Sequence, residues 1–176
     1  MNLTLRTLAA FPVVFLLAAP MVLPAAGQER PVPVAELAAG ALMFPDDSLV
    51  TEGFFGGAVR FHVLPRISIG PEIAYVRGTN HSHLVLTGNV TFDFLAPVNG
   101  RPRPVTPFAV VGGGVFRTRE SFPNDETFAS GEGAFTAGGG GRVRIGDHVL
   151  AGVEARIGWE LHLRLNALVG VRLGGS

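Results

Sequence analysis

The sequence predicts an all-β fold, an eight-stranded antiparallel up-and-down β-barrel preceded by a signal helix. Apolar and polar side chains alternate with a period of two along most of the chain after residue 33. A helix would instead repeat its apolar face every 3.6 residues. The composition agrees, because 47% hydrophobic residues with only 16% charged ones is too apolar for disorder and unusual for a soluble domain. The N-terminal leader is the third observation.

The leader has the composition of a secretory signal peptide. No residue from Thr7 to Gln28 is charged, and Arg6 is the only charged side chain before that stretch. Small residues at 25–27 favour cleavage near Gly27-Gln28. The predicted domains are therefore a signal peptide, 1-27, and a barrel, 28-176. An N-terminal membrane anchor is the alternative, which three prolines in the leader disfavour.

Four strands are expected in the first half of the mature chain. In the second of them, Glu52, Arg60 and His62 share one parity, and Phe55 and Phe61 occupy the other. This is the pattern of a sheet with one polar and one apolar face. The expected strands are Val34 to Phe44, Glu52 to Val63, Arg66 to Arg77 and His83 to Phe94.

Four more strands are expected in the second half. The weakest is the first, where we place Arg117 and Arg119 on the polar, inward face and Phe108, Val110 and Phe116 on the apolar, outward face. Eight tilted strands of roughly 9–11 residues are enough for a small membrane barrel. The expected strands are Pro107 to Arg119, Glu132 to Ile145, His148 to Glu160 and His162 to Leu173.

The connections are expected to alternate in character. Leu64-Pro65 and Gly146-Asp147 are two-residue hairpin candidates, the second with glycine first as a type II′ turn prefers, and Ala96 to Pro104 is longer. These three connections would be periplasmic. The extracellular set comprises 45–50, 78–82, 120–127 and the tight turn near 159–161.

The polar parity carries both signs of charge. A membrane barrel turns its apolar parity to lipid and fills a narrow interior with its polar parity, so interior charges must be paired. All 14 cations are Arg, which pairs carboxylates bidentately. A soluble barrel with its apolar parity inward also fits the alternation. The predicted interior charge network is Glu36, Glu52, Arg60, Arg66, Glu72, Asp93, Arg117, Glu132, Arg142, Arg144, Glu154, Arg156, Arg164 and Arg172.

Aromatic residues are expected to form two belts at the membrane interfaces, as in other barrels of the membrane. Phenylalanine predominates where tyrosine and tryptophan are more usual. The outer belt would contain Phe44, Tyr75, Phe116 and Trp159, and the periplasmic belt Phe61, Phe92, Phe94 and Phe108.

The runs Pro107 to Val115 and Gly139 to Arg144, together with the leader and the eight alternating strands, carry a family resemblance. The chain resembles the small outer-membrane β-barrel proteins, which include the transmembrane domain of outer membrane protein A, protein X and the opacity-type surface proteins. The resemblance covers about residues 32–174. It implies a monomer in the bacterial outer membrane, in contact with lipid and lipopolysaccharide, delivered by periplasmic chaperones and the barrel-assembly machinery. The chain departs from the family by ending in Gly174-Gly175-Ser176, without a terminal aromatic residue.

No enzyme, metal or cofactor site is predicted. The absence of Cys excludes thiolate chemistry and disulfides, and zero net charge disfavours nucleic-acid binding. The best catalytic candidate is Asn80-His81-Ser82-His83. Barrels that deacylate lipid A use a His and a Ser two residues apart, and that spacing is missing here. Metal binding by His81, His83 and His162 is an alternative to an unliganded loop.

The predicted function is a structural or surface-interaction role without a wide pore, because side chains fill a lumen of eight strands. Two alternatives stay open: a lipid-modifying outer-membrane enzyme, and a soluble secreted or periplasmic β-barrel.

Overall fold

A computed structural model describes residues 32–45, 49–78, 81–99, 103–121, 127–158 and 162–174. The predicted signal peptide and its cleavage site lie outside these ranges. The eight strands are β1 (Val34–Pro45), β2 (Leu49–Leu64), β3 (Ile67–Arg77), β4 (His81–Asp93), β5 (Val105–Ser121), β6 (Thr127–Ile145), β7 (Val149–Gly158) and β8 (Leu163–Arg172). In the described ranges, no helix has the length and apolar character needed to span a membrane.

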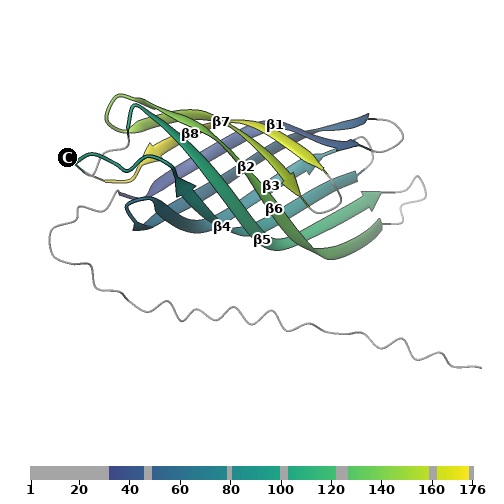
Figure 1. Ribbon diagram of the computed structural model, residues 1–176. Helices are drawn as coiled ribbons and strands as arrows, with labels where there is room; N and C mark the ends of the chain where they lie inside the picture. Colours follow the sequence, from purple (N-terminus) through teal and green to yellow (C-terminus); the bar gives the residue numbers. More distant parts are fainter. Residues whose placement is uncertain are drawn as a thin grey trace, which may run out of the picture.

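The strands form one closed barrel (Figure 1). Each strand pairs antiparallel with the next, and β1 pairs with β8 from Val34 opposite Arg172 to Met43 opposite Leu163. Closure pairs the backbone groups that an open sheet would leave exposed at its edges. The predicted eight-stranded antiparallel barrel is therefore confirmed.

The two ends of the barrel differ. Residues 32 and 174 lie at one end, at the left in Figure 1, which we call the terminal end; it also carries the β2–β3, β4–β5 and β6–β7 connections. The opposite end is called the far end. There β6 runs beyond β7, since it pairs with β5 as far as Ser121 opposite Thr127 but with β7 only from Thr136 onward.

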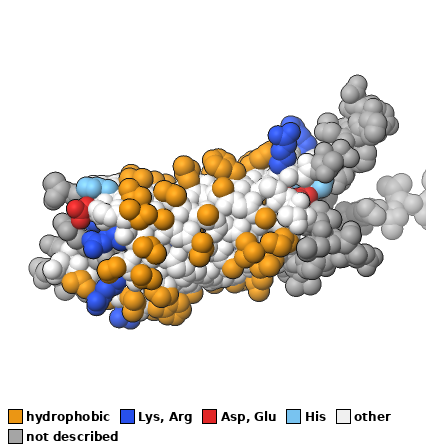
Figure 2. Space-filling view, turned by 90° about the horizontal axis from the view of Figure 1, so that it is seen from above, with side chains coloured by type: hydrophobic (Ala, Val, Ile, Leu, Met, Phe, Trp, Pro, Cys, Tyr) orange, Lys and Arg blue, Asp and Glu red, His pale blue; other side chains and the backbone are white. Residues whose placement is uncertain are grey.

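Side chains alternate between the inside and the outer wall along each strand. In β8, Leu168 is 4% exposed and its neighbour Val169 is 54% exposed. Apolar side chains are spread over the outer wall, and the charged side chains visible in Figure 2 lie near its two ends. Inside, small apolar clusters form around Phe54 and Phe108. The apolar parity thus faces outward, which is the reverse of a soluble β-protein.

The face assignment predicted for Pro107 to Arg119 is wrong. Phe108 is 2% exposed and points inward, whereas Val111 is 48% exposed on the outer wall. Arg117 consequently lies on the exposed outer face, outside the interior network. The inward position 112 has no room for a side chain, because a Cβ at Gly112 would overlap Asn89 Oδ1.

The predicted aromatic belts are also wrong in part. Tyr75, Phe61, Phe92 and Phe94 are exposed on the outer wall, as expected. Trp159 lies outside the described residues. Phe108 is buried, and the inward parity of β1 and β5 places Phe44 and Phe116 beside His83, with ring centroids 6.4 and 4.7 Å from its ring. These three rings pack against interior polar groups instead of forming part of a belt.

The β6–β7 connection is one residue longer than predicted. Ile145 pairs with Val149, so the loop comprises Gly146, Asp147 and His148. Gly146 has a φ of 69°, a left-handed conformation that glycine adopts without steric cost. The β2–β3 turn is Pro65-Arg66, one residue later than expected, because Leu64 pairs with Ile67 after an irregularity in β2.

The glycine run of β6 allows a stringent packing test. A Cβ at Gly140 would collide with the carbonyl oxygen of Val153 and lie 2.9 Å from the Phe108 ring, whereas a Cβ at Gly141 would meet nothing within 4 Å. We expect Gly140→Ala to lower the free energy of unfolding by about 1–3 kcal/mol, since overpacking forces the backbone to shift. Gly141→Ala is the matched control and should lower it by less than about 0.5 kcal/mol. Urea unfolding of the refolded barrel measures the free energy of unfolding of both variants. Equal losses in the two variants would contradict the close approach of Gly140 to Val153.

Candidate functional site

The interior polar side chains form three groups along the barrel axis. The terminal layer contains Glu36, Arg60, Asp93 and Arg142, with His62 beside Asp93. The middle layer contains Glu72, Glu154, Arg156 and Arg164, with Asn89 and Asn166. The far layer contains Glu52, His81 and His83. Their order follows from strand register: Arg60 pairs with Val34 at the terminal end, and Glu52 pairs with Leu42 towards the far end.

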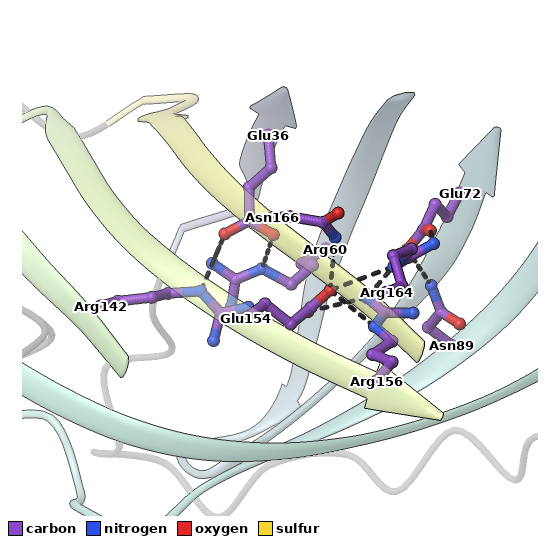
Figure 3. Close-up of polar contacts among 9 residues, drawn as sticks. All are labelled: Glu36, Arg60, Glu72, Asn89, Arg142, Glu154, Arg156, Arg164 and Asn166. Atoms are coloured by element: carbon purple, nitrogen blue, oxygen red, sulfur yellow. Dashed lines mark hydrogen bonds and ion pairs between the residues drawn. The ribbon is translucent and has the colours of Figure 1, made fainter. Parts of the chain in front are cut away.

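In the terminal layer, Glu36 accepts hydrogen bonds from two arginines (Figure 3). Arg60 donates through Nε and Nη2 at 2.8 and 2.7 Å, and Arg142 donates through Nε at 2.9 Å. Arg142 Nη1 also lies 3.6 Å from Asp93 Oδ1. The guanidinium of Arg142 stacks 3.5 Å from the centroid of the Phe108 ring, which adds a cation–π contact. This layer ties β1, β2, β4 and β6 together through side chains.

In the middle layer, Glu154 accepts a bidentate pair of hydrogen bonds from Arg156 at 2.7 and 2.9 Å. Arg164 joins the two carboxylates, donating to Glu154 at 3.0 Å and to Glu72 at 2.6 Å. Arg156 Nη2 lies 2.9 Å from Glu72 Oε2. Asn89 donates to Glu72 at 2.8 Å, so one oxygen of this carboxylate has both a charged and a neutral partner.

Each of these two layers contains two carboxylates and two guanidiniums. Burying an ion costs several kcal/mol unless a partner of opposite sign is placed close to it. Glu36, Glu72, Arg142 and Arg156 are all buried, and each has a partner within 3 Å. Each layer is therefore formally neutral in itself.

The layers also fill the lumen. Two voids, one among Glu72, Glu154 and Arg164 and one among Arg60, Asp93 and Arg142, measure about 20 Å³ each. A void of that size has room for about one water molecule. At these two levels the described side chains leave little open space.

The far layer joins residues of two strands that are not neighbours. Glu52 of β2 contacts His81 Nε2 of β4 through Oε1, and its Oε2 lies 3.6 Å from His83 Nε2. His83 Nδ1 forms a 3.0 Å hydrogen bond with Thr118 Oγ1 of β5. The sequence places Glu52 and His81 29 residues apart, and only the register of β2, β3 and β4 brings them together.

Nine of the fourteen predicted interior charges lie in these three layers. The other five lie elsewhere: Arg66 is exposed in the β2–β3 turn, Arg117 is on the outer wall, Glu132 is exposed where β6 extends beyond β7, and Arg144 and Arg172 are half-buried at the terminal end. Arg172 there donates to the carbonyl of Asp147 at 2.9 Å. Alternation predicts which face of a strand a residue occupies, but not its height along the barrel axis. Three of these residues lie nearer the terminal end of the barrel than the three layers do, Glu132 lies beyond the end of β7, and Arg117 lies on the outer face.

The sequence reasoning missed the neutral members of the layers. Asn89 and Asn166 donate to Glu72 and Glu154 at 2.8 and 3.2 Å. Phe54 lies beneath Arg164, 4.4 Å from its guanidinium carbon. The sequence signal that could have identified them is their parity, since both asparagines and Phe54 share the inward face with the charged residues.

Comparison with known proteins finds the same architecture. No protein-family model matches the sequence, and no curated protein matches it. Among solved structures, Neisserial surface protein A superimposes with a TM-score of 0.66 at 12% identity, covering 80% of this chain and 96% of the other. This chain has the fold of the small outer-membrane β-barrels.

Two further structures agree with that identification. The N-terminal barrel domain of Pseudomonas aeruginosa OprF has a TM-score of 0.60 at 11% identity, over 80% of this chain and 97% of that domain. Ail, the attachment invasion locus protein of Yersinia pestis, has a TM-score of 0.54 at 10% identity, over 80% of this chain and 95% of Ail. At this level of sequence identity the likeness shows the fold alone and carries no ligand over to this chain. The small-barrel architecture is what the chains share.

Proposed function

We propose that the protein is an outer-membrane β-barrel with a structural or surface-interaction role, without a wide pore and without catalytic activity. The observation that carries the proposal is the reversed distribution of side chains. Leu37, Phe55 and Ile157 are each at least 60% exposed on the outer wall, while the carboxylates and guanidiniums are paired inside. Soluble monomers rarely expose contiguous apolar patches larger than a few hundred Å². Lipid around the outer wall would remove the free-energy cost of exposing these apolar side chains to water.

The orientation follows from the position of the chain ends. The signal peptide proposed for residues 1-27 delivers the N-terminus to the periplasm, and the terminal end then faces the periplasm. The far end, with the longer β5–β6 hairpin, would face the outside of the cell. In this proposal periplasmic chaperones and the barrel-assembly machinery handle the chain in transit, and the folded barrel is a monomer.

Fractionation tests this location. We expect the mature chain in the outer-membrane fraction, extracted only by detergent, and with a gel mobility that changes on boiling because the barrel resists SDS. Recovery from the aqueous periplasm or the medium without detergent would contradict the proposal and favour the soluble alternative. The enzymatic alternative has its own test: a lipid A acylation pattern that changes with the gene and reverts in His81→Ala would overturn the non-catalytic role.

The outer wall at the far end supports contact with lipopolysaccharide. Arg77 of β3 and Arg119 of β5 both pair with Ser82 of β4, so they lie on the same outer face with one strand between them. Arg117 lies on that face as well, and all three are exposed. Guanidinium groups bind phosphates in bidentate fashion. In the proposed orientation, the anions expected beside these arginines are the phosphates of lipid A.

Neutralising these three arginines is expected to weaken lipopolysaccharide binding. The triple variant Arg77→Gln, Arg117→Gln, Arg119→Gln should bind lipopolysaccharide in detergent at least about tenfold more weakly, since a hydrogen bond to a charged group contributes about 1.5–3 kcal/mol. The control carries Arg66→Gln and Arg103→Gln, which remove two exposed cations at the terminal end. Equal binding by both variants, measured by titration with fluorescent lipopolysaccharide, would reject the proposed contact.

A further inference from the structure

The far layer has the composition of a transition-metal site. Glu52, His81 and His83 each offer one ligand atom, and these three atoms lie within 4.8 Å of one another. Neutral imidazole nitrogens and a carboxylate oxygen are the ligands that zinc prefers when no thiolate is present. Zinc imposes no directional preference of its own, so it accepts ligands from two strands.

One oxygen of the Glu52 carboxylate is available to bind a metal ion. The Glu52 side chain is 2% exposed, and its Oε2 has no hydrogen-bond partner among the described residues. That oxygen lies 3.6 Å from His83 Nε2. Two ligands of a tetrahedral zinc ion with bonds of about 2.1 Å are roughly 3.4 Å apart, so this spacing is close to what one ion requires.

Gly78 lies beside two of the three ligand residues. A Cβ at Gly78 would lie 2.5 Å from both Glu52 Oε1 and His81 Nε2. Zinc lies about 2.0–2.2 Å from such atoms, so an ion bound to both residues would lie near this point beside the Gly78 Cα. Any residue larger than glycine at 78 would occupy that point.

The surroundings orient the ligands. When His83 Nδ1 donates to Thr118 Oγ1 at 3.0 Å, Nε2 carries the lone pair and faces Glu52. Ligating histidines are usually held by such a second hydrogen bond. The rings of Phe44 and Phe116 pack against His83 and screen it, whereas the side chain of His81 is 33% exposed and leaves the site open to ions from solution.

From these observations we propose that Glu52, His81 and His83 form a zinc-binding site at the far end of the barrel, with its fourth position open to water or to a ligand from outside. The bound ion ties β2 to β4 across β3 and closes the lumen at a third level. His162, the third histidine of the far end, packs against Phe44 with ring centroids 5.9 Å apart and over Gly158, so it lies outside this ligand set.

The test is zinc titration of the untagged full-length mature protein, refolded in detergent and followed by calorimetry with zinc chloride. We expect one zinc ion per chain, and at least a tenfold loss of affinity in Glu52→Gln, His81→Ala and His83→Ala. Gly78→Ala should lose zinc to the same extent although it removes no ligand. His148→Ala and His162→Ala are the matched histidine controls and should bind as the parent protein does. Magnesium chloride should not compete.

A second measurement covers variants that fold poorly. Zinc should raise the urea midpoint of the parent protein, because a ligand that binds only the folded state stabilises it by mass action. Gly78→Ala should lose that rise while keeping its heat-modifiable mobility. Substoichiometric zinc in the parent protein, or an equal loss of affinity in His148→Ala, would overturn the proposal. Neither outcome would bear on the location of the barrel in the membrane.

Discussion

Replacing Glu154 with Leu is expected to lower the free energy of unfolding by about 3–5 kcal/mol, the typical cost of removing one partner of a buried ion pair. Glu154 accepts hydrogen bonds from Arg156, Arg164 and Asn166, and its side chain is 3% exposed. Without this carboxylate, the middle layer holds two guanidiniums against Glu72 alone. Urea unfolding in lipid vesicles, followed by circular dichroism, measures the loss.

Two controls distinguish charge imbalance from the loss of packing. Glu132→Leu removes an exposed carboxylate from β6 and should change the free energy of unfolding by no more than about 0.5 kcal/mol. Adding Arg156→Met to Glu154→Leu leaves Glu72 paired with Arg164 at 2.6 Å, which restores neutrality. We expect this double variant to recover at least half of the loss. If it is less stable than the single variant, the layer is not held by charge balance.

Introducing an arginine in the middle of the outer wall is the second substitution with a large expected effect. Val153 lies near the middle of β7, opposite Ala167 of β8, and is 65% exposed. On a wall surrounded by lipid, Val153→Arg should lower the free energy of unfolding by about 2–4 kcal/mol, the cost of a cation at the bilayer midplane. On a wall surrounded by water, the same change should cost less than about 0.5 kcal/mol.

The matched control places the same charge at the edge of the wall. Ile145 is 56% exposed at the end of β6, beside the β6–β7 turn. Ile145→Arg should cost about 0–1 kcal/mol, because the penalty falls towards the membrane interface. Both variants are unfolded in the same vesicles with urea. Equal and small losses at the two positions would favour the soluble barrel.

Strand number and pairing could be predicted from the sequence because each is a local property. Alternation over 10 to 16 residues, as in β2 and β8, defines a strand, and the turn residues between strands define antiparallel neighbours. In most of the eight strands the sequence also places the charged residues on one face and most of the large apolar residues on the other. In β5 both parities are apolar over residues 108–115, so the pattern there is ambiguous.

The error in β5 has a physical cause. Arg117 and Arg119 are the only charged residues from Pro107 to Arg119. They lie where β5 approaches the far end, at a height at which the outer face is polar too. The inward positions are decided instead by neighbours across the sheet. Phe108 lies under Arg142, and Gly112 leaves space for Asn89. No periodicity within β5 contains that information.

The sequence by itself determined the strands, their antiparallel order and the composition of a polar interior that includes both signs of charge. The tertiary structure alone decided which charges meet. Glu36 and Arg142 are 106 residues apart, and Glu52 and His81 are 29 apart, yet each pair is in contact. Barrel closure and strand register set those distances, because a shift of one residue would turn every side chain of a strand to the other face. The neutral layers and the far layer are therefore properties of the closed barrel.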